Sequence, residues 1–303
     1  MHQRTLKREV VCAGTGLHTG QAVTMRIKPA PADSGIVFHR KDVGVDIPAH
    51  VENITNSTLA TSLGVNGTSI QTVEHLLGAL YGLGIHNVRI ETDGPEIPAM
   101  DGSALPFVRM IMRAGIARQN RPKKLLIIRE PIEISDNDAV VHLRPSLQPI
   151  FSFRISYPHP LLRHQALTVL LSSPHFKREI SPARTFGFLD EYEDLKSRGL
   201  ARGGSLDNAI VLDKSRVLND EGLRFKDEFV RHKILDSMGD LSLLGFPVIG
   251  HLNAHKSGHR LHHMLLEKLL ECKSHWTLID PETISLDTNH RPIDELHIQP
   301  IPA

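Results

Sequence analysis

The apolar positions of the N-terminal part first alternate and then recur at helical spacing. Single polar residues separate Val23, Met25 and Ile27, which is typical of a half-buried strand. Over residues 71–80 the apolar residues instead fall three or four positions apart, which predicts an amphipathic helix. The same reasoning predicts further elements in this part: strands at 36–38 and 87–91 and a helix at 105–114.

After a polar, proline-containing stretch at 118–124, which is typical of a linker, an order of strands followed by helices starts again. Strands before helices in both parts predict an α+β fold with two similar domains, at 1–118 and 124–303, each a β-sheet layered with helices. The end of the chain, from about 285 to 303, has no periodicity. The second part is predicted to contain strands at 125–134, 139–143, 151–156 and 167–171, and helices at 188–197, 226–244 and 258–271.

Composition narrows the class of protein. Hydrophobic residues make up 40% and charged residues 23% of the 303 residues, as in ordinary globular domains. A formal charge of +1 and 5% aromatic residues give no general attraction to nucleic acid or to anionic membranes. Cys12 and Cys272 form no disulfide framework. We find no signal peptide and no apolar run that would span a bilayer, so a soluble, cytoplasmic protein is expected.

The helix predicted at 226–244 has the pattern of half a metal site. His232, Asp236 and Asp240 follow one another at intervals of four, so they share one helix face. Catalytic zinc takes three protein ligands and leaves one position open, and His75 on the 71–80 helix is the candidate for the third ligand. Glu74 beside it would then serve as a general base. With 19 histidines in the chain, ordinary structural roles for these residues stay open from spacing alone.

Six motifs, in order along the chain, carry a resemblance to a known family. They are TVEHL at 72–76, PAMDGS at 98–103, ARTFGF at 183–188, GGSLDNA at 203–209, DEFVRHK at 227–233 and HKSGH at 255–259. The chain resembles the UDP-3-O-acyl-N-acetylglucosamine deacetylases, zinc amidases of lipid A biosynthesis in Gram-negative bacteria. The resemblance implies two α+β domains whose helices pack against each other between the two sheets.

The resemblance also implies a role for each matching residue. His75, His232 and Asp236 match the ligands of one zinc ion, and no organic cofactor is needed. Glu74 matches the general base. His259 matches a second catalytic histidine, which either protonates the leaving amine or stabilises the oxyanion. The remaining catalytic positions are Asp240 as the carboxylate that orients this histidine, Thr185 as the hydroxyl that binds the tetrahedral intermediate, and Lys233 as a positive charge near the substrate.

The implied substrate is an acylated UDP-amino sugar, and substrate contacts are expected in two places. An insert at about 188–213 would line a passage for the acyl chain, and other side chains would contact the nucleotide. Two alternatives stay open: a zinc amidase acting on another N-acetyl sugar, and a sugar-nucleotide binder without catalysis. A monomer is expected. The candidate contacts are Leu189, Leu200, Leu206, Ala209 and Val211 for the acyl chain, and Phe186, Tyr157, Lys233 and Lys256 for the nucleotide.

Overall fold

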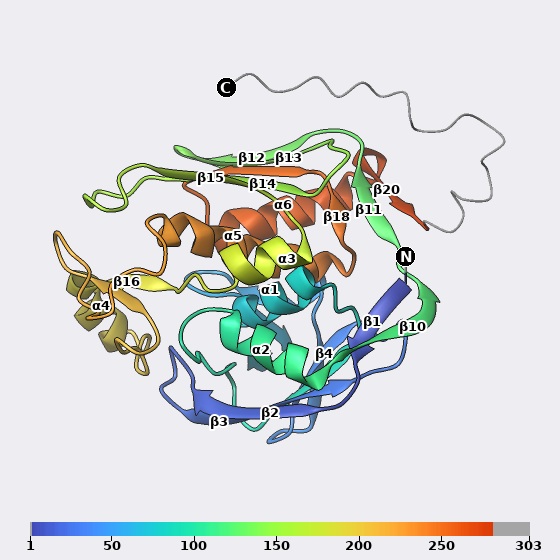
Figure 1. Ribbon diagram of the computed structural model, residues 1–303, viewed down its shortest axis with the longest axis horizontal. Helices are drawn as coiled ribbons and strands as arrows, with labels where there is room; N and C mark the ends of the chain where they lie inside the picture. The colour runs from blue at the N-terminus through green and yellow to red at the C-terminus, as the bar shows by residue number, and fades with distance from the viewer. Residues whose placement is uncertain (1, 281–303) are drawn as a thin grey trace.

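A computed structural model describes residues 2–280 of the chain. Two five-stranded sheets form its outer layers, and the long helices lie between them (Figure 1). This layered arrangement confirms the predicted α+β class with helices packed between two sheets. The helices are α1 (Glu74–Leu83), α2 (Leu105–Ala114), α5 (Glu228–Leu241) and α6 (His259–Glu271).

The two sheets have the same connectivity. The first has the order β2-β3-β9-β4-β5 and the second the order β12-β13-β19-β14-β15. In each, the third and fourth strands of that order are parallel, whereas all other neighbours are antiparallel. The strands are β2 (Val10–Thr15), β3 (Ala22–Pro29), β4 (Ile36–Arg40), β5 (Val45–Pro48) and β9 (Val88–Thr92), then β12 (Ile132–Asp136), β13 (Ala139–Arg144), β14 (Ile150–Ile155), β15 (Gln165–Leu170) and β19 (His251–His255).

The alternation in the sequence turns one face of each sheet toward the helices. Met25 and Ile27 of β3 are fully buried, and Ile27 lies opposite Ile90 of β9 in the antiparallel register. Phe151 and Phe153 of β14 are buried in the same way in the second sheet. Apolar inner faces of both sheets and the helices therefore share one continuous core.

The insert of the second part is a small unit at one side of the molecule (Figure 1). Strands β16 (Phe186–Phe188) and β17 (Ile210–Leu212) pair in parallel and are joined through the short helix α4 (Tyr192–Ser197). The helix predicted at 188–197 is thus largely correct, although its first turn is a 3-10 helix (Leu189–Glu191).

Shorter elements connect and flank these layers. The prediction of a linker at 118–124 is wrong for most of its length, because β10 runs through Pro122 and pairs with β1. Its half-exposed positions give it no clear alternation. The predicted strand at 125–134 is two strands. These elements are β1 (His2–Leu6), β10 (Ile116–Pro122), β6 (Ile54–Asn56), β7 (Ser62–Val65), β8 (Thr68–Ile70), β11 (Leu125–Ile128), β18 (Val248–Ile249), β20 (Trp276–Ile279), α3 (Ser173–His175) and a π-helix (Phe176–Ile180).

Within residues 2–280, no helix has both the length and the apolar character needed to cross a bilayer. The tail at 285–303, for which no element was predicted, lies outside the described residues.

Candidate active site

Helices α1 and α5 cross at two glycines, which lets their backbones approach closely. Gly239 of α5 packs on the backbone of Glu74, so that a Cβ atom there would lie only 2.8 Å from the Glu74 carbonyl carbon. Gly78 of α1 packs in turn against Leu235. Small residues at a crossing allow contact between main chains that larger side chains prevent. This crossing brings the first turn of α1 over the polar face of α5.

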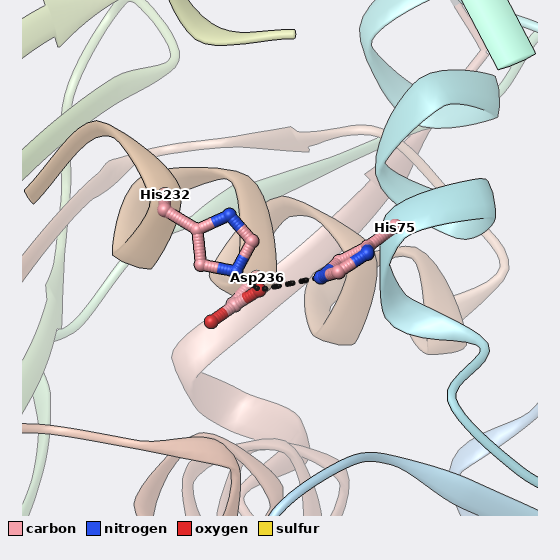
Figure 2. A group of neighbouring side chains, drawn as sticks. All are labelled: His75, His232 and Asp236. Atoms are coloured by element: carbon pink, nitrogen blue, oxygen red, sulfur yellow. Dashed lines mark ion pairs between the residues drawn. The ribbon is translucent and has the colours of Figure 1, made fainter. Parts of the chain in front are cut away.

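His75, His232 and Asp236 converge at that crossing (Figure 2). The Nε2 atom of His75 lies 3.6 Å, and that of His232 3.3 Å, from Oδ1 of Asp236. The two imidazole rings meet edge to face, with centroids 4.8 Å apart. All three side chains are buried. One ligand atom from each lies within 4.8 Å of the others, which is compatible with a common cation.

The hydrogen bonds around these side chains fit a metal better than a purely structural role. Nδ1 of His232 donates to the carbonyl of Ala183 at 3.0 Å, which leaves the Nε2 lone pair facing the site. Burial lowers the pKa of His232 to about 3 although Asp236 opposes the shift, so the imidazole is neutral. Oδ1 of Asp236 is buried and has no hydrogen-bond partner among residues 2–280. Two imidazoles, one of them held by an outer hydrogen bond, plus one carboxylate form the donor set of an open zinc site.

A carboxylate and an imidazole that are not part of this set face the same space. Glu74 is buried, and its Oε2 accepts the backbone N–H of Thr61 at 3.0 Å. Its Oε1 lies 3.9 Å from Nε2 of His259, which is also 3.9 Å from Oδ2 of Asp236. Burial raises the pKa of Glu74, against the attraction of His259 and His75. The site therefore places a carboxylate of raised proton affinity opposite an imidazole.

Asp240 holds that imidazole in place. Its Oδ2 accepts hydrogen bonds from Nδ1 of His259 and from Nδ1 of His262, both at 2.8 Å. Burial alone would lower the pKa of His259, but the charge of Asp240 outweighs it and raises the value to about 9. His259 is thus a cation at neutral pH, with Nε2 pointing toward Glu74.

Besides His259, three partners of Asp240 were missed in the sequence: Thr61, His262 and His263. The hydroxyl of Thr61 donates to Oδ1 of Asp240 at 2.6 Å, and Nε2 of His263 lies 3.2 Å from the same oxygen. His262 and His263 are three and four residues after His259 on α6, so helical spacing contained that signal. Thr61 lies in a loop before β7, and nothing in the local pattern marks it.

An aromatic group lies beside the three converging residues. The ring of Phe186 is 6.5 Å from that of His232 and 5.8 Å from that of Tyr157, between centroids. Nζ of Lys233 lies 5.6 Å from the Phe186 ring and donates to Oδ2 of Asp236 at 3.1 Å. Burial opposes the charge on Lys233, but Asp236 outweighs it and raises the pKa. The structure thus brings Phe186, Tyr157 and Lys233 to the site.

The other predicted residues have other partners or lie partly exposed in the insert. Thr185, just before Phe186, is half-buried and donates its backbone N–H to the carbonyl of Gly102 at 2.8 Å. Lys256 forms an ion pair with Asp138 at the turn between β12 and β13. In the insert, Leu189 and Leu206 are exposed, at 48% and 47%, and the remaining apolar candidates are half-buried: Leu200, Ala209 and Val211.

Known proteins are similar to this chain over nearly its whole length. The sequence profile of the family described as UDP-3-O-acyl N-acetylglycosamine deacetylase matches residues 3–271. A protein of Syntrophus aciditrophicus (strain SB) is 48% identical, over 91% of this chain and 88% of its own length. A protein of Myxococcus xanthus (strain DK1622) is 49% identical, over 92% of this chain and 89% of its own length. Both are named UDP-3-O-acyl-N-acetylglucosamine deacetylase.

Proposed function

Since this chain belongs to the UDP-3-O-acyl N-acetylglycosamine deacetylase family, we propose that it hydrolyses the N-acetyl group of UDP-3-O-acyl-N-acetylglucosamine. The products are acetate and UDP-3-O-acyl-glucosamine, in an early step of lipid A biosynthesis. The observation that carries the proposal is the convergence of His75, His232 and Asp236 from two helices, with Glu74 and His259 facing the same space.

We assign one zinc ion to His75, His232 and Asp236. Two neutral imidazoles and one carboxylate leave a net positive charge at the metal, and the unpartnered Oδ1 of Asp236 gains a partner when the ion binds. When bound, zinc supplies a Lewis acid beside the acetamide carbonyl. Lys233 keeps Asp236 ionised, because its ammonium lies 3.1 Å from the second carboxylate oxygen.

The protein's own groups move the protons. Glu74 takes a proton from the attacking water, and its raised pKa suits it to this task at neutral pH. The C–N bond then breaks while His259 gives a proton to the leaving nitrogen, so that a free amine departs. Asp240 keeps that imidazole charged and oriented. The hydroxyl of Thr185 is proposed to hydrogen-bond the oxygen of the tetrahedral intermediate.

Substrate contacts are assigned on either side of the reacting amide. We assign the nucleotide part of the substrate to the surface formed by Phe186, Tyr157 and Lys233. Lys256 also binds the nucleotide if its ion pair with Asp138 breaks. The acyl chain is assigned to the insert. Supporting this, Leu189 and Leu206 of the insert are exposed at its surface, and Leu200, Ala209 and Val211 are half-buried.

Deacetylation of acylated and unacylated UDP-N-acetylglucosamine tests the substrate. Each methylene that the insert buries contributes about 0.8 kcal/mol, and such remote binding energy also serves to position the acetamide. We therefore expect kcat/KM to be several orders of magnitude higher for the acylated substrate. Equal rates would leave an amidase acting on another N-acetyl sugar, and binding without acetate release would leave a sugar-nucleotide binder.

Leu206→Asp provides the matching variant test. The substitution places a charge where the acyl chain is proposed to run, so it should reduce the rate on the acylated substrate far more than on the unacylated one. Leu147→Asp is the control, because Leu147 is 79% exposed between β13 and β14, outside the insert. A fall of both rates together in Leu206→Asp would indicate a folding defect and contradict the assignment.

A further inference from the structure

Glu96 is a buried carboxylate that is held by four neutral donors. It is 1% exposed and lies between β9 and α2. Its Oε1 accepts from the backbone N–H of His18 at 2.9 Å and from the hydroxyl of Thr72 at 2.8 Å. Its Oε2 accepts from the backbone N–H and from the hydroxyl of Thr19, at 2.8 and 2.7 Å. Hydrogen bonds to an ionised acceptor are about twice as strong as neutral ones, so this carboxylate fixes its neighbours firmly.

On one side, Glu96 holds the turn on which the insert rests. The backbone N–H of Arg202 donates to the carbonyl of His18, and that of Gly203 to the carbonyl of Leu17, at 3.2 and 3.0 Å. Gly203 packs so closely on the Gly16 carbonyl that a Cβ atom there would overlap it. Because backbone rests directly on backbone, a shift of the turn at 16–20 displaces this part of the insert.

On the other side, Glu96 holds the chain that leads into α1. Thr72 is two residues before Glu74 and has a left-handed backbone, with φ of 56°, an unfavourable conformation for a β-branched residue. The backbone N–H of Gln71 donates to the carbonyl of Pro95, and that of Ile97 to the carbonyl of Gln71. A single carboxylate therefore connects the docking turn of the insert with the start of the helix that carries the proposed base.

We propose that Glu96 is a positioning residue that determines selectivity for the acylated substrate, because it fixes the position of the insert relative to the reaction centre. The inference rests on the proposed function. Glu96 forms no hydrogen bond with the three converging residues or with the described residues of the insert, and it acts through the turn at 16–20 and through Thr72.

Glu96→Gln is the variant of choice because it preserves shape. An amide has only one acceptor oxygen, so in either orientation its NH2 group faces a backbone N–H, of His18 or of Thr19, that has lost its acceptor. We expect the ratio of kcat/KM for acylated over unacylated substrate to fall by about tenfold or more, since misplacement by about 1 Å costs up to ~10²-fold in rate. The rate on the unacylated substrate should fall less than the rate on the acylated substrate, because only the acylated substrate also depends on the insert. The zinc content should stay near the wild-type value.

Thr19→Val supplies a milder test should Glu96→Gln fold poorly. It removes one hydroxyl donor and keeps the backbone donor of the same residue, so the ratio should fall in the same direction by a smaller factor. Glu133→Gln, at an exposed carboxylate on β12, is the control for the change of charge.

Proportional losses on both substrates would overturn the inference, because they indicate a general structural role. An unchanged ratio in Glu96→Gln would overturn it as well, while the proposed function would stand if the wild type still preferred the acylated substrate. A wild type without that preference would overturn both.

Discussion

Replacing Gly239 by alanine would test whether the helix crossing sets the geometry of the proposed zinc site. An added Cβ atom would lie 2.8 Å from the carbonyl carbon of Glu74 and 2.9 Å from its Cα, whereas carbon atoms normally rest at about 3.5–4.0 Å. The helices must therefore separate by about 1 Å at this point. Ligand positions at a metal are constrained to within about 0.2 Å, so His75 would move out of range of His232 and Asp236.

Stability and function should respond differently to this substitution. Alanine favours a helix over glycine by about 1 kcal/mol, while an overpacked contact costs about 1–3 kcal/mol, so the two partly cancel and the melting temperature should change little. Zinc affinity, measured by competition with a chelator, should fall by about 10–100-fold, as when a supporting contact of a ligand is lost. The deacetylation rate should fall by about 10² at saturating zinc, because Glu74 moves as well.

Gly78→Ala is the matched control on the partner helix. Its Cβ atom would meet mainly the terminal Cδ1 of Leu235, at 2.8 Å, and the carbonyl of that residue at 3.1 Å. A side-chain methyl can rotate away, so losses should be smaller than for Gly239→Ala. Wild-type zinc affinity and rate in Gly239→Ala, together with a higher melting temperature, would refute the role assigned to the crossing.

Three further predictions concern the ionisable groups. Elemental analysis should show that His75→Ala and His232→Ala lose zinc. Glu74→Ala and His259→Ala should keep zinc, and their kcat should fall by about 10²-fold. Zinc loss in either of these two variants would contradict its proposed role. Activity should rise with pH as Glu74 ionises and fall as pH rises through the pKa of His259, about 9, and this basic limb should be absent in His259→Ala. Burial and the charge of Lys123 lower the pKa of His86 to about 4 in the folded protein. Because the unfolded chain binds that proton more readily, the free energy of unfolding should decrease by a few kcal/mol as pH falls from about 6.5 to 4. A His86→Gln variant with the same dependence of unfolding free energy on pH would contradict this.

The sequence allowed prediction of those parts that depend on local periodicity. The apolar stripes of α1, α5 and α6 placed each helix within a few residues of its observed bounds. Helical spacing put His232, Asp236 and Asp240 on one face, and the structure confirms that they are buried there. The juxtaposition of His75 with His232 needed the resemblance to a known family, because it depends on contacts between residues far apart in the chain.

Other features could not be read from local patterns. The strand character of residues 118–122 follows from pairing with β1 and not from alternation. Thr61 and Glu96 gain their roles from partners 179 and 78 residues away in sequence, respectively. The ion pair of Lys256 with Asp138 depends on the position of the β12–β13 turn. A single polar residue in a loop has no signal until its tertiary partners are known.

The two sheets have matching connectivity, although the centre between them holds one proposed base and one proposed acid. In a symmetric dimer of identical chains, every residue near the axis is present twice. Helices α1 and α5 occupy equivalent places, between corresponding strands of the two sheets. Yet α1 contributes Glu74 and His75 from its first turn, and α5 contributes His232 and Asp236 from its middle. Because both halves belong to one chain, each equivalent position can carry a different amino acid, and a fold of nearly twofold architecture encloses a centre with no symmetry.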